Sequence, residues 1–221
     1  MPDLSAREMV IAAHLKFENV ICKFKAVRAV DEVSFDIQPH EHVALIGSNG
    51  SGKTTLLRAI LGLHPLSSGH IRLDGISAHS SADWEKFRSR IAWMPQRQAT
   101  GRFPLLVHEL LESSSDPASA LLHARNLAVG ELLYRPLHAL SGGQLQRVFL
   151  ARALGSISGG AGLLLADEPT AALDFDGQAR VAEILRSLPV TVLVVTHDRA
   201  MADRCDRVVE MGGGRLREVM S

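Results

Sequence analysis

The sequence has no surplus of charge of either sign and no unusual composition. Its 221 residues include 24 basic and 24 acidic side chains, so the formal net charge is zero. Proteins that bind nucleic acid through a general basic field need an excess of Lys and Arg, so we expect no nucleic-acid partner. Apolar residues make up 46% and charged residues 22% of the chain, which excludes a disordered chain or a coiled-coil rod.

Cysteines are few and long apolar runs are absent. Cys22 and Cys205 are too isolated for a disulfide framework, which favours a reducing, cytosolic setting. The longest apolar runs, 162–166 and 189–195, are far shorter than the roughly 20 residues that span a bilayer. The first residues carry no basic and apolar signal-peptide pattern. We therefore expect a cytosolic domain that depends on a partner for any membrane span.

Strand and helix patterns alternate along the chain and predict an α/β fold. Strand patterns cover 14–20, 33–37, 42–46, 70–73, 163–166, 190–196 and 208–211. Helical spacing covers 54–63, 105–111, 119–128, 143–154 and 176–188, with a further short helix after 196. Uninterrupted apolar strands indicate strands buried on both faces, and hence a parallel sheet covered by helices. Helices separated by Ser, Pro and Gly between about 97 and 155 indicate a helical insert.

A glycine-rich loop lies between an apolar strand and a helical pattern. Its sequence, Gly47-Ser48-Asn49-Gly50-Ser51-Gly52-Lys53-Thr54-Thr55, fits G-x-x-x-x-G-K-[ST]. The glycines let backbone N–H groups converge, and the helix adds the positive end of its dipole, so the loop is predicted to hold a polyphosphate. We expect Lys53 to bridge the β- and γ-phosphates and the Thr54 hydroxyl to ligate Mg²⁺.

Two carboxylates, Asp167 and Glu168, follow the apolar strand at 163–166. The end of a buried strand lies at the carboxyl edge of the sheet, where open α/β folds bind their ligands. Consecutive strand side chains point in opposite directions, so the two groups are predicted to have different roles. Asp167 is predicted to hold Mg²⁺, directly or through water, and Glu168 to polarise an attacking water.

A second possible anion site precedes the helical pattern at 143–154. It reads Leu140-Ser141-Gly142-Gly143-Gln144, with Ser141 as the predicted helix cap. A serine hydroxyl, glycine amides and a helix N-terminus together can bind an anion. The residues alone do not explain why one nucleotide would need both this corner and the glycine-rich loop.

The order of these motifs resembles that of ATP-binding-cassette (ABC) ATPases. The loop 47–55, Gln96, the pentapeptide 140–144, the carboxylates after 163–166, Asp174 and His197 occur in the family's order, and the resemblance covers about 14–215. It implies a P-loop NTPase (RecA-like) core with a mainly parallel sheet, an antiparallel β subdomain and a helical insert. It also implies a single domain, 1–221, divided into a nucleotide-binding core (14–96 and 156–221) and a helical subdomain (97–155).

The resemblance further implies that the protein hydrolyses ATP with Mg²⁺ as a head-to-tail homodimer. Residues 141–144 of one copy are expected to contact the ATP held by loop 47–55 of the other. Asp174 is expected at the seam between the two copies. This pairing would explain the second anion corner.

Further site residues are assigned by position in the family pattern. Phe24 is expected to stack on adenine, although a core phenylalanine is the alternative. Gln96 is expected to sense Mg²⁺ and the attacking water. His197 is expected to contact the γ-phosphate and orient Glu168, and Lys53 completes the catalytic set.

The resemblance to the transporter branch implies that permease subunits are partners. Residues 97–112 look like the region that receives a helix of a membrane permease, which places the protein on the inner face of the cell membrane. The stretch from Gln96 to Ser141 is short for the superfamily, as in importers of zinc, manganese and iron, and Phe103-Pro104-Leu105-x-Val107 is similar to that group. We therefore expect the ATPase subunit of a metal-ion importer.

Two alternatives belong to other classes. A soluble cassette ATPase of the iron–sulfur assembly type fits the length, whereas DNA-maintenance ATPases need long inserts for which 221 residues leave no room. A P-loop kinase acting on a small molecule predicts neither the pentapeptide nor a dimer.

Overall fold

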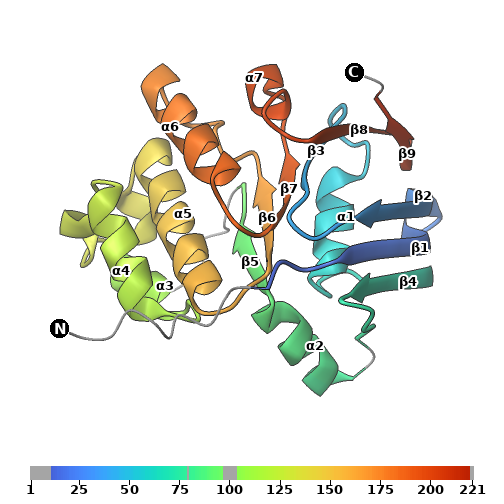
Figure 1. Cartoon of the computed structure of the whole chain (residues 1–221), viewed down its shortest axis with the longest axis horizontal. Helices are drawn as coiled ribbons and strands as arrows, with labels where there is room; N and C mark the ends of the chain where they lie inside the picture. The colour runs from blue at the N-terminus through green and yellow to red at the C-terminus, as the bar shows by residue number, and fades with distance from the viewer. Residues whose placement is uncertain (1–10, 79, 97–103, 220–221) are drawn as a thin grey trace.

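A computed structural model of the chain describes residues 11–78, 80–96 and 104–219. Two sheets and the helices around them make up the fold (Figure 1). Within the described ranges, no helix combines the length and the apolar character that crossing a bilayer requires.

The central sheet has six strands in the order β5-β6-β7-β3-β8-β9. Neighbouring strands from β5 to β8 pair in parallel, and β9 pairs antiparallel with β8 at the edge. The strands are β3 (His42–Ile46), β5 (Ile91–Met94), β6 (Leu163–Asp167), β7 (Thr191–Val195), β8 (Arg207–Gly212) and β9 (Arg215–Glu218). The predicted, mainly parallel sheet is confirmed.

A smaller antiparallel sheet has the order β2-β1-β4. Its strands are β1 (Leu15–Phe24), β2 (Val27–Ile37) and β4 (Ser68–Leu73). The β1–β2 hairpin ends close to the glycine-rich loop, because Phe24 and Ala29 line the same cavity as that loop.

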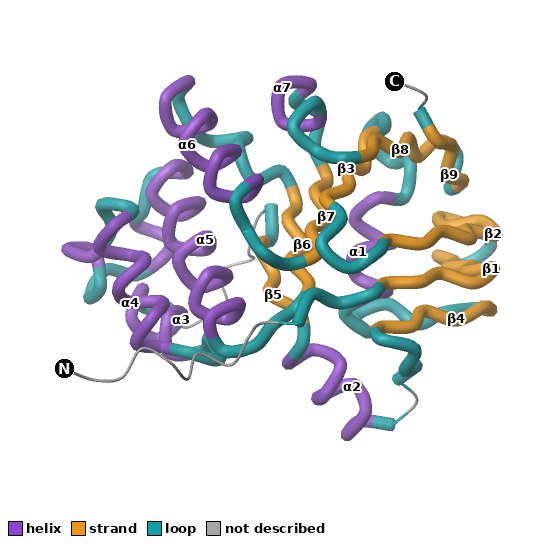
Figure 2. The backbone as a smooth tube through the Cα atoms, in the orientation of Figure 1, coloured by secondary structure: helices purple, strands orange, loops and turns teal. Residues whose placement is uncertain are grey.

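The helices between residues 107 and 186 gather on one side of the central sheet. Figure 2 shows α3–α6 on that side and the antiparallel strands on the opposite side. The helices are α1 (Lys53–Ile60), α2 (Ser81–Ser89), α3 (Val107–Glu112), α4 (Pro117–Asn126), α5 (Gly142–Ser158), α6 (Phe175–Arg186) and α7 (Arg199–Ala202), with short 3₁₀ turns at Gly130–Leu132 and Leu137–Ala139.

The central strands have apolar side chains on both faces, as the uninterrupted runs predicted. In β6, Leu164 and Ala166 belong to the core cluster formed with α3–α6. Leu163 and Leu165 belong to the cluster formed with α1 and the antiparallel sheet. Because strand side chains alternate between faces, one short apolar strand joins both cores and holds the loop after it in a fixed place.

The sequence prediction missed α2, β5, β9 and both 3₁₀ turns, together with the last part of β1 and the first half of β2. The helix α2 buries only Phe87, so it has no apolar stripe. Its start carried a usable signal, because Ser80 and Asp83 form a capping box. The strand β5 has only four residues, and its pairing with β6 defines it better than any local pattern.

Candidate active site

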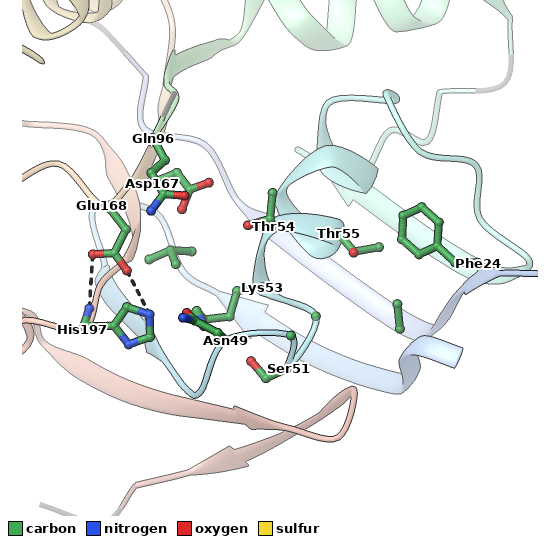
Figure 3. Close-up of a pocket in the computed structure, with 14 residues that line it drawn as sticks. Phe24, Asn49, Ser51, Lys53, Thr54, Thr55, Gln96, Asp167, Glu168 and His197 are labelled. Atoms are coloured by element: carbon green, nitrogen blue, oxygen red, sulfur yellow. Dashed lines mark hydrogen bonds and ion pairs between the residues drawn. The ribbon is translucent and has the colours of Figure 1, made fainter. Parts of the chain in front are cut away.

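Four segments meet at the carboxyl edge of the parallel sheet. The glycine-rich loop follows β3, Gln96 lies beyond β5, Asp167 ends β6 with Glu168 directly after it, and His197 follows β7. These strands are neighbours in the sheet, so their carboxyl ends come together. The result is a cavity of about 400 Å³ (Figure 3).

Most residues predicted for the nucleotide site line this single cavity. Its lining consists of Phe24, Ala29, Asn49, Gly50, Ser51, Gly52, Lys53, Thr54, Thr55, Gln96, Asp167, Glu168, Val195 and His197. Of the predicted loop residues, Gly47 and Ser48 lie outside the lining and contribute their carbonyls to Lys53 instead.

The glycines at both ends of the loop are required by close backbone contacts. A Cβ on Gly47 would lie 2.2 Å from the Met211 carbonyl oxygen, and one on Gly52 would lie 2.1 Å from that of Ala29. Gly52 also has a φ of 113°, which L side chains rarely adopt. It caps α1 without any side-chain hydrogen bond, so the first turn of α1 presents its N–H groups to the cavity.

The Lys53 side chain is folded onto its own loop. Its Nζ donates to the carbonyl oxygens of Gly47 at 2.7 Å and Ser48 at 2.9 Å. Burial lowers the pKa of Lys53, and the nearby charges of Glu168 and Asp167 act in the opposite direction. The ammonium group is thus held at the mouth of the amide-lined loop, where an anionic ligand would lie.

The two carboxylates differ in environment, as their alternation on the strand predicted. Asp167 is almost fully buried, and this burial, together with the charge of Glu168, raises the pKa of Asp167 to about 6. Lys53 partly offsets the rise. A positive charge bound in the cavity would favour the ionised form of this carboxyl group.

Glu168 is fixed by contacts to its side chain and its backbone. Its Oε1 lies 3.3 Å from His197 Nε2, and its Oε2 accepts from the His197 backbone N–H at 3.3 Å (Figure 3). Its own N–H donates to the Val195 carbonyl at 2.8 Å. With a φ of 51°, Glu168 adopts the left-handed conformation that non-glycine residues seldom take. Such conformations often lie at active sites.

Phe24 lies at the surface and is no core residue. Its side chain is 49% exposed at the end of β1 and lines the cavity. The ring packs at 4.4 Å, centroid to centroid, on His64, which follows α1. One face of the phenyl ring is therefore supported by protein, and the position suits stacking of a flat ligand.

The serine–glycine corner forms a separate hollow of about 520 Å³. Ser141, Gly142 and Gly143 line it together with Asp174. Ser141 caps α5 by accepting from the Gln144 N–H at 3.3 Å, and Gln144 Oε1 accepts from the Ser141 N–H at 3.0 Å. Gln144 is thus engaged in a capping box, a role that the sequence analysis did not assign.

The donors at the cavity suit ATP and Mg²⁺. The loop amides and Lys53 are a phosphate-binding set. The Thr54 hydroxyl, the Gln96 amide and the Asp167 carboxylate supply oxygen atoms, the ligands that Mg²⁺ prefers. A phosphate loop after β3, carboxylates after β6 and a histidine after β7 define a P-loop ATPase.

Comparisons with known proteins narrow this class. The sequence profile of the ABC transporter family matches residues 30–171. The chain belongs to the ABC transporter family, as one of its ATPase domains.

Several relatives cover most of the chain. The zinc import ATP-binding protein ZnuC 1 of Hahella chejuensis is 34% identical over 190 residues, which is 83% of this chain and 68% of the relative. The hemin import ATP-binding protein HmuV of Rhodopseudomonas palustris is 35% identical over 219 residues, with 91% and 80% covered. A Brucella ovis ATP-binding protein named for peptide import is also 35% identical, over 214 residues, with 88% and 67% covered.

Among solved structures, an ATP-binding cassette in a dimeric, post-hydrolysis state bound to ADP and Pi is similar to this chain. The TM-score is 0.80 at 27% identity, covering 94% of this chain and 99% of that chain. The fold class and the ATPase activity predicted from the sequence are confirmed at the level of the family.

Proposed function

We propose that the chain is the ATP-hydrolysing subunit of a membrane importer of metal ions or metal chelates, acting on the inner face of the membrane. The observation that carries the ATPase part is the meeting of the glycine-rich loop, two carboxylates, Gln96 and His197 in one cavity. The transporter part rests on the family to which the chain belongs.

In this proposal the loop binds the phosphates of ATP. The amides of residues 47–55 surround the β- and γ-phosphates, and Lys53 leaves its carbonyl partners to contact them. The adenine ring stacks on the exposed face of Phe24. With the phosphates held by the loop and the adenine held by Phe24, the γ-phosphate points toward the carboxylates.

Thr54, Gln96 and Asp167 would hold Mg²⁺. When bound, the ion neutralises charge on the phosphate oxygens. Its charge would also keep the Asp167 carboxyl ionised at neutral pH, offsetting the burial that raises the pKa of this group to about 6.

Glu168 acts as the base for the attacking water in this proposal. His197 holds both oxygens of the Glu168 carboxylate at one end of the cavity. The half-exposed imidazole of His197 remains accessible to the γ-phosphate. Gln96 lies beyond β5 and lines the same cavity, and in this proposal it contacts the same water.

Two copies are proposed to pair head to tail around two ATP molecules. The support is geometric: Ser141, Gly142 and Gly143 do not line the cavity that holds the loop, yet they form an exposed second anion corner. Asp174 lines the same hollow as Ser141, in keeping with a position at the seam. The hydroxyl of Ser141 would then complete the γ-phosphate site of the other copy.

The permease is proposed to contact the helical subdomain, residues 97–155, which we distinguish from the core formed by 14–96 and 156–221. In support, α3–α5 pack together and share one apolar cluster. Of the proposed docking region 97–112, residues 97–103 lie outside the described residues. The remainder includes Leu105, which is 40% exposed at the start of this helical group.

A metal cargo is the finer part of the proposal. Relatives named for zinc and hemin import support it, and a similarly close relative named for peptide import points to another cargo. Copurification from membranes tests the transporter role, with an integral permease as the expected partner. Recovery of soluble iron–sulfur scaffold proteins alone would support the alternative class. Metal accumulation by cells with and without the gene then tests the cargo.

A further inference from the structure

A buried glutamine joins the serine–glycine corner to the carboxylate of the same chain. Gln146 lies on α5, the helix that Ser141 caps, and is only 5% exposed. Its Nε2 donates to the backbone carbonyl oxygen of Glu168 at 3.0 Å. No motif in the sequence singles out Gln146.

The carbonyl that Gln146 contacts belongs to a residue in a costly conformation. Glu168 has a φ of 51°, and such a conformation persists only where surrounding contacts hold it. Its N–H donates to the Val195 carbonyl at 2.8 Å, and its carbonyl also accepts from the Ala171 N–H at 3.3 Å. These bonds hold the backbone on both sides of Glu168, and they therefore set the direction in which the carboxylate leaves the chain.

Of these three partners of the Glu168 backbone, Val195 lies on β7 and Ala171 follows β6, whereas Gln146 lies on the helix α5. It follows Ser141 by five positions on one continuous helix, so the two are about 7.5 Å apart along the axis. A shift of the first turn of α5 would move Gln146 with it. The carbonyl of Glu168 would then lose or change its partner.

We infer that Gln146 is a positioning residue for Glu168 and couples the two nucleotide sites of the dimer. The inference rests on the proposed function, in which Glu168 is the base and Ser141 contacts the ATP of the partner. When Ser141 contacts the ATP held by the partner copy, Gln146 transmits the resulting shift of α5 to Glu168 of its own chain. The position of this carboxylate then depends on whether the partner's site holds ATP. Each site therefore responds to occupancy of its neighbour.

The test replaces Gln146 with Met, which keeps the length of the side chain and removes the N–H donor. Gln146→Met should bind ATP as the wild type does, within about twofold, and lose about 10- to 100-fold in kcat, the cost of a misplaced catalytic group. With binding intact and turnover slowed, an ATP-bound dimer should accumulate in size-exclusion chromatography. The Hill coefficient for ATP should be above one in the wild type and fall toward one in the variant.

Val148→Ala is the matched control. Val148 is fully buried on the same helix, so this truncation should lower the melting temperature and leave kcat within about twofold of the wild type. A loss of kcat in both variants in proportion to their melting temperatures would overturn the inference, because the contact would then be structural only. Gln146→His keeps an N–H donor and provides a second variant should Gln146→Met not fold. Its kcat should stay well above that of Glu168→Gln. A Gln146→His variant as inactive as Glu168→Gln would contradict the inference.

Glu168→Gln, measured in parallel, distinguishes a failure of this inference from a failure of the proposed function. If Glu168→Gln is inactive while Gln146→Met turns over like the wild type, the inference fails and the proposed function stands. If Glu168→Gln itself retains near wild-type turnover, the proposed function fails.

Discussion

The His197 imidazole and the Glu168 carboxylate form a close pair at the carboxyl edge of the sheet, with 3.3 Å between His197 Nε2 and Glu168 Oε1. The backbone N–H of His197 donates to the other carboxylate oxygen at the same distance. One residue at the end of β7 therefore fixes the orientation of a carboxylate at the end of β6. This arrangement supports the proposal that the two residues act as one unit in hydrolysis.

Replacing Glu168 with Gln should abolish turnover while ATP binding persists. The amide keeps the shape of the side chain but cannot accept a proton, so kcat should fall by about 10²- to 10⁴-fold. A steady-state ATPase assay measures the loss, and filter binding measures ATP affinity. Glu183→Gln is the control, since Glu183 lies on the exposed side of α6 and its side chain forms a surface ion pair with Arg204. Turnover of Glu168→Gln near the wild-type level would refute the assigned base.

Replacing Lys53 with Ala should weaken nucleotide binding. Charge-assisted hydrogen bonds contribute about 1.5–3 kcal/mol each, so the Kd for ATP should rise by about 10- to 100-fold. Isothermal titration calorimetry gives the value. Lys86→Ala, a change of an exposed lysine on α2, should leave the Kd unchanged. An unchanged Kd in Lys53→Ala would remove the phosphate-binding role of the loop.

Phe24→Ala should raise the KM for ATP without lowering kcat. An aromatic contact contributes about 0.5–1.5 kcal/mol beyond its buried area, so the expected rise is about 2- to 10-fold. Phe24→Tyr preserves the ring and should behave as the wild type. Equal KM values in Phe24→Ala and the wild type would show that adenine lies elsewhere.

Both cysteines should react slowly with iodoacetamide in the folded protein. Burial raises the pKa of Cys22 and of Cys205 to about 11, with the Asp206 charge adding to the rise at Cys205. At pH 8 the thiolate fraction is then about 100-fold below that of an ordinary thiol. Because the fold favours the neutral thiols, this contribution to stability is present below about pH 9 and is lost as the pH rises toward 11. Mass spectrometry with and without denaturant checks the rates; rapid alkylation of native protein would contradict the burial.

The phosphate loop and its strand–loop–helix setting were predictable from sequence because the backbone itself imposes the residues. Gly47 and Gly52 have no room for a Cβ, and that requirement is visible as glycine in the chain. The buried strands β6 and β7 were equally visible, since both faces of each strand are apolar.

The contacts that hold the site were not predictable in the same way. The bond from Gln146 to Glu168 joins residues 22 positions apart, and the positive φ of Glu168 depends on partners from β7 and α5. His64, which packs against Phe24, comes from the loop after α1. Local sequence patterns do not indicate tertiary partners that are distant in the chain. For the same reason the four-residue strand β5 was not predicted.

A crystal structure of the Glu168→Gln variant with ATP tests the central claim most directly. The account predicts a two-fold dimer in which Ser141 Oγ of one copy lies at hydrogen-bonding distance, about 2.7 Å, from the γ-phosphate held by loop 47–55 of its partner. A structure in which Ser141 is remote from every γ-phosphate, in every two-fold assembly, would contradict it.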